Sequence, residues 1–167
     1  GIPFRVAGFL NLTPDHLDYH ADMDAYGAAK ARLFLEHLSF GGTAIIDIDD
    51  PYGKRLASEL RTARPDVTVS TLSVQHSDAE ISFDALRIDR NGVHGTLRTP
   101  SGPVEITSPL LGRFNASNVA MAAAIALAVG IPGNIAGRAL AAAKVRGRLE
   151  RVDVGQDFAV VVDYAHS

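Results

Sequence analysis

The first 72 residues alternate between two kinds of apolar pattern, and this alternation constrains the fold more than any other feature. Residues 4–10, 43–48 and 67–72 are short apolar runs typical of buried strands. Residues 22–38 instead repeat apolar side chains every three or four positions, as an amphipathic helix does, with Asp22 available as its N-cap. A turn at 49–53 leads into a second helix, to about Arg61. This order predicts an α/β fold with a mostly parallel sheet flanked by helices.

The middle of the chain has a different pattern. Residues 81–90, 93–99 and 104–107 are strand-like runs, and Asn91-Gly92 between the first two is a strong hairpin signal. We therefore expect a small antiparallel subsheet attached to the parallel sheet. Helices are predicted at 115–129 and 132–143, followed by strands at 150–154 and 158–162.

Composition narrows the classes of function. The chain has 167 residues, of which 47% are hydrophobic, and its net charge of -3 comes from intermixed acidic and basic residues. One domain is expected, and with no run of Lys and Arg we expect neither nucleic acid nor a membrane surface as a partner. The alanine-rich stretch at 120–131 is too short for a membrane span and predicts a buried helix. The absence of cysteine excludes disulfides and thiolate metal sites and fits a cytoplasmic location.

The densest chemical cluster follows the first predicted strand. It places four possible metal ligands within six residues: Asp15, His16, Asp18 and His20. Open α/β sheets bind ligands at the carboxyl ends of their strands, and oxygen ligands with an occasional imidazole suit magnesium or manganese. On spacing alone, the acids capping a turn and the histidines lying at the surface explain the cluster equally well.

Lys30 is unusual for its position on a helix. Helical spacing places it on the apolar face with Tyr26 and Leu33, away from Arg32 and Glu36. Partial desolvation favours a neutral amine, which can act as a nucleophile or take up carbon dioxide as a carbamate, an anionic metal ligand. A lysine whose charged tip reaches the surface is the simpler alternative.

The residues of this region resemble a known family. The run Asn-Leu-Thr-Pro-Asp-His-Leu-Asp-Tyr-His at 11–20, then Tyr26 and Ala-Ala-Lys at 28–30, is similar to the ATP-dependent Mur ligases, and most of all to those that add the third peptide residue to UDP-N-acetylmuramoyl-L-alanyl-D-glutamate. Further segments match in the same order, at 49–53, 111–118, 147–150 and 162–166. The resemblance covers essentially the whole chain and implies the family's central, P-loop-NTPase-like domain.

The resemblance also implies roles for individual residues. Those for metal are His16, which would help bind one magnesium ion, and Lys30, which as a carbamate would contact a second. Those for the nucleotide are Asn118 and Arg148 at the base, Asp163 near the adenosine, and Asn115 and His166 as neighbours.

The nucleotide residues also have simpler explanations. Asn115 stands where a helix N-cap is expected, and Asn118 could support that cap. Arg148 could be a surface charge. Asp163 is harder to explain without a ligand, because it ends the apolar run 158–162, and an acid at the carboxyl end of a buried strand points toward a ligand site.

In the family, ATP phosphorylates the carboxylate of the nucleotide-linked peptide, and the amine of an amino acid displaces the phosphate to form an amide. ATP and Mg²⁺ are thus the implied cofactors, in peptidoglycan synthesis. The sequence has no Gly-rich loop ending in Gly-Lys-Thr or Gly-Lys-Ser. We therefore expect residues 1–167 to be a partial central ATP-binding domain, inactive alone, with the phosphate loop upstream and without the N-terminal UDP-binding and C-terminal amino-acid-binding domains.

Two other functions remain open from the sequence. Folylpolyglutamate and cyanophycin synthetases share the Asp-x-Ala-His ending at 163–166 and ATP-dependent amide chemistry. A non-catalytic binding module that kept the fold is the alternative from another class. The sequence identifies neither the amino acid added nor the oligomeric state.

Overall fold

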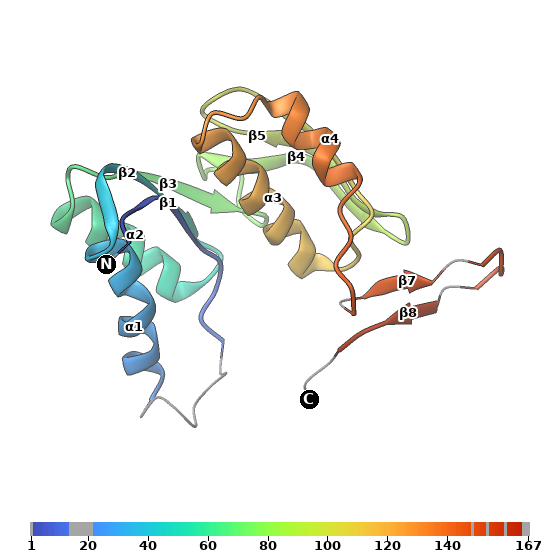
Figure 1. Cartoon of the computed structure of the whole chain (residues 1–167), viewed down its shortest axis with the longest axis horizontal. Helices are drawn as coiled ribbons and strands as arrows, with labels where there is room; N and C mark the ends of the chain where they lie inside the picture. Colours follow the sequence, from blue (N-terminus) through green and yellow to red (C-terminus); the bar gives the residue numbers. More distant parts are fainter. Residues whose placement is uncertain (1, 14–21, 148, 153, 159, 165–167) are drawn as a thin grey trace.

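The computed structural model describes residues 2–13, 22–147, 149–152, 154–158 and 160–164 (Figure 1). Its first half is β1 (Phe4–Phe9), α1 (Met23–Leu35), β2 (Leu38–Asp47), α2 (Pro51–Ala63) and β3 (Thr68–Ser73). The three strands pair in parallel, in the order β1-β2-β3. The predicted βαβαβ unit is therefore confirmed.

The two faces of β2 contact different helices, as the pleat of a strand requires. Ala44 and Ile46 face the cluster that includes residues of α1 and α2, whereas Ile45 between them faces α3 (Arg113–Ala128). All three side chains are at most 1% exposed. A strand buried on both faces reads as a continuous apolar run, which is the pattern that the sequence has here.

The first helix is shorter than its apolar spacing predicted. Asp22 is its N-cap, and its carboxylate accepts a hydrogen bond from the Ala25 amide at 2.8 Å. The helix ends at Leu35, and Leu38, predicted as its last residue, instead begins β2 opposite Phe4. Leu38 is buried in either structure, so an apolar position could not show whether it belonged to the helix or the strand.

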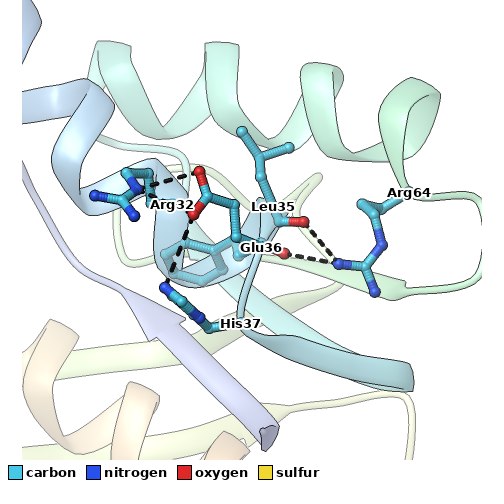
Figure 2. Close-up of polar contacts among 6 residues, drawn as sticks. Arg32, Leu35, Glu36, His37 and Arg64 are labelled. Atoms are coloured by element: carbon cyan, nitrogen blue, oxygen red, sulfur yellow. Dashed lines mark hydrogen bonds and ion pairs between the residues drawn. The ribbon is translucent and has the colours of Figure 1, made fainter. Parts of the chain in front are cut away.

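Arg64 fixes the end of α1 that is remote from the carboxyl ends of the strands. Its guanidinium group donates to the Leu35 carbonyl at 2.9 Å and the Leu38 carbonyl at 3.1 Å, and forms an ion pair with Asp66 at 2.8 Å. Figure 2 shows Arg64 reaching this helix end, beside the exposed Arg32–Glu36 pair. Carbonyls that a helix leaves unpaired are thereby satisfied, and the ends of α1 and α2 are tied together.

The antiparallel strands are β4 (Ile81–Asp89), β5 (Gly92–Arg98) and β6 (Val104–Ser108). The predicted Asn-Gly hairpin joins β4 and β5. The predicted attachment of this antiparallel portion to the parallel sheet is confirmed, because β4 pairs in parallel with the end of β3 and the strands continue one six-stranded sheet. Two residue pairs form this junction, Leu72 with Ile81 and Ser73 with Ser82. Because the end of β3 pairs with the start of β4, the chain between them does not have to return along the sheet and can be short.

Helix α3 supplies the alanine-rich surface that covers the sheet. Its buried residues include Ala116, Ala120, Ala123 and Ala124, so the predicted helix is confirmed as far as Ala128 and is buried on the side that packs against the sheet. Residues 129–131 follow the helix and are exposed. Helix α4 (Gly133–Ala141) packs against β6, where a Cβ on Gly137 would lie 2.6 Å from the Glu105 carbonyl oxygen. Among the described residues, no helix is long and apolar enough to cross a membrane.

The last two strands, β7 (Glu150–Val152) and β8 (Val160–Val162), form a two-stranded antiparallel ribbon. Figure 1 shows this ribbon apart from the six-stranded sheet. The prediction of a buried strand at 158–162 was wrong, because the valines at 160, 161 and 162 are 37%, 44% and 49% exposed. Continuous apolar runs identify strands, but burial depends on what packs against them.

Candidate functional site

A pocket of about 260 Å³ opens at the carboxyl ends of β1, β2 and β3. The first turns of α3 form its other wall. It is lined by Leu10, Asn11, Asp47, Asp49, Asp50, Val74, Gln75, Arg113, Phe114, Ser117 and Asn118. Open α/β sheets bind ligands at this edge, so the pocket is the candidate site.

Asp50 connects α2 to the loop that follows β1. One carboxylate oxygen accepts hydrogen bonds from the Tyr52 and Gly53 amides, at 2.8 and 3.2 Å, and caps α2. The other accepts one from the Leu12 amide at 2.9 Å. Both oxygens of Asp50 are therefore occupied by protein donors.

Asp49 has a similar role toward the loop that follows β3. Its carboxylate accepts hydrogen bonds from the Ser73 hydroxyl and, at 2.9 Å, from the Val74 amide. The residues that the structure describes include no group of three or more His, Cys, Asp or Glu arranged to hold a metal ion. Asp49 and Asp50 thus shape the walls of the pocket by holding its loops.

Asp47 is the most deeply buried acid of the pocket, with 3% of its surface exposed. Burial and, to a smaller extent, the charge of Asp49 raise the pKa of Asp47, and hydrogen bonds from the Asp49 amide, at 2.9 Å, and from the Ser117 hydroxyl lower it. The net result is a rise from 3.8 to about 6. Asp47 therefore links the end of β2 to the start of α3 and is more easily protonated than an ordinary aspartate.

Lys30 contacts Asn11 from α1. Its ammonium group donates to the Asn11 carbonyl at 3.0 Å and lies 4.7 Å from the centre of the Tyr26 ring and 6.0 Å from that of Phe9. The side chain is half-buried beside a second pocket, of about 360 Å³, between β1 and α1. Asn11 lines both pockets. Lys30 therefore lies in the second pocket, on the other side of Asn11 from Asp47 in the first.

Asn115 and Asn118 form a pair at the start of α3. The side-chain amide of Asn118 donates to the side-chain oxygen of Asn115 at 3.0 Å. The side-chain amide of Asn115 in turn donates to the Leu111 carbonyl at 2.7 Å. Asn115 is not the N-cap, as its position had indicated; Gly112 is, with φ +88° and no side-chain cap. Asn115 is buried, whereas Asn118 is exposed and lines the pocket.

The other residues singled out in the sequence are not gathered at the pocket. His16, Arg148 and His166 lie outside the described residues, as do Asp15, Asp18 and His20. Asp163 follows β8, is exposed, and does not line the pocket.

Sequence reasoning did not select Asp47, Asp49 or Ser117 as site residues. A signal for the two acids was present, because the apolar run at 43–48 leads directly into acids at the end of a strand. The same rule had singled out Asp163. Nothing local marked Ser117, whose contact with Asp47 joins residues far apart in the chain.

Comparison with known proteins gives a consistent result. The sequence model of the Mur ligase middle domain matches residues 1–126. A UDP-N-acetylmuramoyl-L-alanyl-D-glutamate--2,6-diaminopimelate ligase from Nostoc sp. is 44% identical over 171 aligned positions, which cover 100% of this chain and 33% of the relative. The chain thus spans about a third of the length of the curated relatives it matches.

Solved structures agree with the sequence match. A structure of a ligase of the same name has a TM-score of 0.82 at 28% identity, covering 98% of this chain and 33% of its own. Folylpolyglutamate synthase from Mycobacterium tuberculosis has a TM-score of 0.75 at 27% identity, covering 97% of this chain and 36% of its own. The match to the middle-domain model over residues 1–126 and the 44% identity to the relative from Nostoc show that this chain belongs to the Mur ligase family.

Proposed function

We propose that this chain is the greater part of the ATP-binding domain of a ligase that adds the third amino acid to UDP-N-acetylmuramoyl-L-alanyl-D-glutamate. The observation that carries the proposal is the 44% identity, across the whole chain, to a relative of that name. The name of the relative also supports 2,6-diaminopimelate as the amino acid added. The strand-end pocket is the proposed nucleotide site.

The reaction begins with transfer of the γ-phosphoryl group of ATP to a carboxylate of the nucleotide-linked peptide. The resulting acyl phosphate is attacked by the amine of the amino acid, the C–O bond to phosphate breaks, and an amide, ADP and phosphate result. Positioning and electrostatics dominate such catalysis. In this chain, the exposed amide of Asn118 offers polar contacts to the base, and the buried Asn115 holds it in place.

Lys30 is the proposed metal-binding residue of α1, as a carbamate. The ammonium group first loses one proton to solvent. The neutral amine then forms an N–C bond with dissolved carbon dioxide and releases a second proton, so that a carbamate anion replaces the ammonium cation. The position of Lys30 supports this role, because its side chain is half-buried against Asn11, which also lines the strand-end pocket. An unmodified ammonium would repel a cation, so Lys30 suits magnesium only when carbamylated.

Magnesium would neutralise charge on the phosphates of ATP when bound. The proposed ligands are the Lys30 carbamate and His16. Asp49 and Asp50 are poor candidates because backbone amides and the Ser73 hydroxyl already occupy their carboxylates. His166, Arg148 and Asp163 stay proposals for the nucleotide, from the resemblance alone.

The deciding experiment uses the longer protein that contains this chain. We expect ATP-dependent amide formation from UDP-N-acetylmuramoyl-L-alanyl-D-glutamate and 2,6-diaminopimelate, and none by residues 1–167 alone. Replacing Lys30→Met should lower kcat by about a thousandfold, because it removes a proposed ligand of the magnesium ion that would neutralise the phosphates. Lys54→Met, at an exposed position of α2, is the control.

Two outcomes would contradict this function. Product formed from a folate-linked glutamate, with none from the muramoyl dipeptide, would favour the folylpolyglutamate synthases. Full activity of Lys30→Met would remove Lys30 from the site. The carbamate itself is tested by ¹³C NMR with labelled bicarbonate, in which a carbamate signal should appear and should be lost in Lys30→Met.

A further inference from the structure

The peptide group between Asn11 and Leu12 is held from both sides by opposite charges. Its carbonyl oxygen accepts a hydrogen bond from the Lys30 ammonium group at 3.0 Å. Its amide donates to the carboxylate of Asp50 at 2.9 Å. Lys30 belongs to α1 and Asp50 caps α2, so one peptide group of the loop after β1 connects the two helices.

The geometry of a peptide group makes these two contacts support each other. In a trans peptide the C=O and N–H bonds point in opposite directions, so a cation at the oxygen and an anion at the N–H both align with the peptide dipole. No cis peptide bond occurs among the described residues. The carboxylate of Asp50 therefore polarises the carbonyl that Lys30 contacts, and hydrogen bonds with one charged partner are stronger than neutral ones.

Asp50 is itself held firmly. The first turn of α2 is wedged against β2, because a Cβ on Gly53 would lie 2.0 Å from the Asp47 carbonyl oxygen. The same turn packs against α1, where a Cβ on Gly27 would lie 2.3 Å from the Tyr52 ring. A carboxylate fixed in this way can define the position of the loop.

We propose that Asp50 is a positioning residue for Lys30 and acts through the Asn11–Leu12 peptide. The importance of this position for catalysis rests on the proposed function, whereas the coupling between Asp50 and Lys30 does not. The competing explanation is that Asp50 only caps α2. Capping requires one oxygen, and Asp50 uses its second oxygen for Leu12.

Asp50→Asn separates the two explanations. Asparagine caps helices about as well as aspartate, so its single side-chain oxygen can keep the contacts to α2, while its NH₂ group cannot accept from Leu12. Asp22→Asn is the matched control. Asp22 caps α1 through the Ala25 amide, and the same change there leaves the Asn11–Leu12 peptide untouched.

The first measurement is the reactivity of the Lys30 amine in the longer protein, in bicarbonate-free buffer without nucleotide. Acetylation by acetic anhydride is followed by mass spectrometry, with the exposed Lys54 as internal reference. We expect Asp50→Asn to raise the rate at Lys30 about fivefold relative to Lys54, as loss of one hydrogen bond allows. A rate equal to that in Asp22→Asn would overturn the proposal.

The second measurement tests the coupling in the other direction, because coupling between two groups is reciprocal. Lys30→Met keeps an apolar stem and removes the ammonium group. We expect it to accelerate hydrogen exchange of the Leu12 amide about fivefold, although Asp50 is unchanged. Exchange at the native rate would also overturn the proposal.

Catalysis is the third measurement. Asp50→Asn should lower kcat about tenfold and leave the KM for ATP within about twofold, because it displaces Lys30 without touching the base site. If the two coupling measurements succeed while neither Asp50→Asn nor Lys30→Met changes kcat, the positioning stands and the proposed function fails.

Discussion

Two strands of this protein are apolar runs that lead into an aspartate, and their surroundings differ completely. Asp47 ends β2, between β1 and β3, and is 3% exposed, with a pKa raised to about 6 by burial. Asp163 follows β8, which pairs with β7, and is exposed. A strand's neighbours, and not its own sequence, decide whether the acid at its end lies in a buried polar site.

The residues that precede the two acids give the largest expected effect. Ile46 is fully buried, whereas Val162 is 49% exposed. Ile46→Ala should lower the free energy of unfolding by about 4 kcal/mol, because it leaves a cavity between β2 and the helices. Val162→Ala should lower it by less than about 1 kcal/mol. Urea denaturation of both variants measures the difference, and equal losses would show that the ribbon is packed as tightly as the sheet.

One glycine beside each of the two aspartate-bearing regions tests how tightly the backbone is packed there. A Cβ at Gly53 would meet the Asp47 carbonyl oxygen, which cannot move without disturbing β2, so Gly53→Ala should cost about 3 kcal/mol of unfolding free energy. A Cβ added at Gly155 would meet no atom within 4 Å, and φ there is +91°, so Gly155→Ala should cost about 1 kcal/mol through the strain of a positive φ. Thermal or urea unfolding of both variants measures the two losses of unfolding free energy. A larger loss for Gly155→Ala than for Gly53→Ala would contradict the prediction.

The smallest expected effect is a pH dependence that belongs to Asp47. Its pKa is about 6 in the folded protein, against 3.8 for an aspartate in the unfolded chain, so the folded state binds the proton more tightly. Stability therefore falls as the pH rises from about 4 to about 6, by about 2 kcal/mol. The asparagine of Asp47→Asn cannot ionise. Between pH 4 and pH 7 the variant should therefore gain about 2 kcal/mol of unfolding free energy relative to the native protein.

The control for this prediction is Asp163→Asn, which makes the same change of charge at the exposed acid. Unfolding free energies of the native protein and both variants at pH 4 and pH 7 isolate the part of the trend that is specific to Asp47. If the stability of Asp47→Asn relative to the native protein stays constant or falls between pH 4 and pH 7, the burial of an ionisable carboxyl at this position is contradicted.

Much of the fold was predictable because it depends on local periodicity. The parallel strands of the βαβαβ unit, the Asp22 cap and the Asn91-Gly92 hairpin were predicted from local patterns, and the structure confirms them. The end of α1 was not predictable, since Leu38 is buried either as a helical or as a strand residue. Gly112, the N-cap of α3, lacks the polar side chain by which caps are recognised.

For the candidate site, the sequence shows which residue types follow each predicted strand, and helical spacing places Lys30 on the apolar face of its helix. The structure adds that Lys30 lies beside Phe9 of β1. Only the tertiary structure decided which of them meet. In the folded protein Asp47 accepts a hydrogen bond from Ser117, and the Asn11–Leu12 peptide is hydrogen-bonded to both Asp50 and Lys30. Asp163 is exposed. The physical reason is that burial and hydrogen bonding depend on partners distant in the chain, and local periodicity carries no information about those partners.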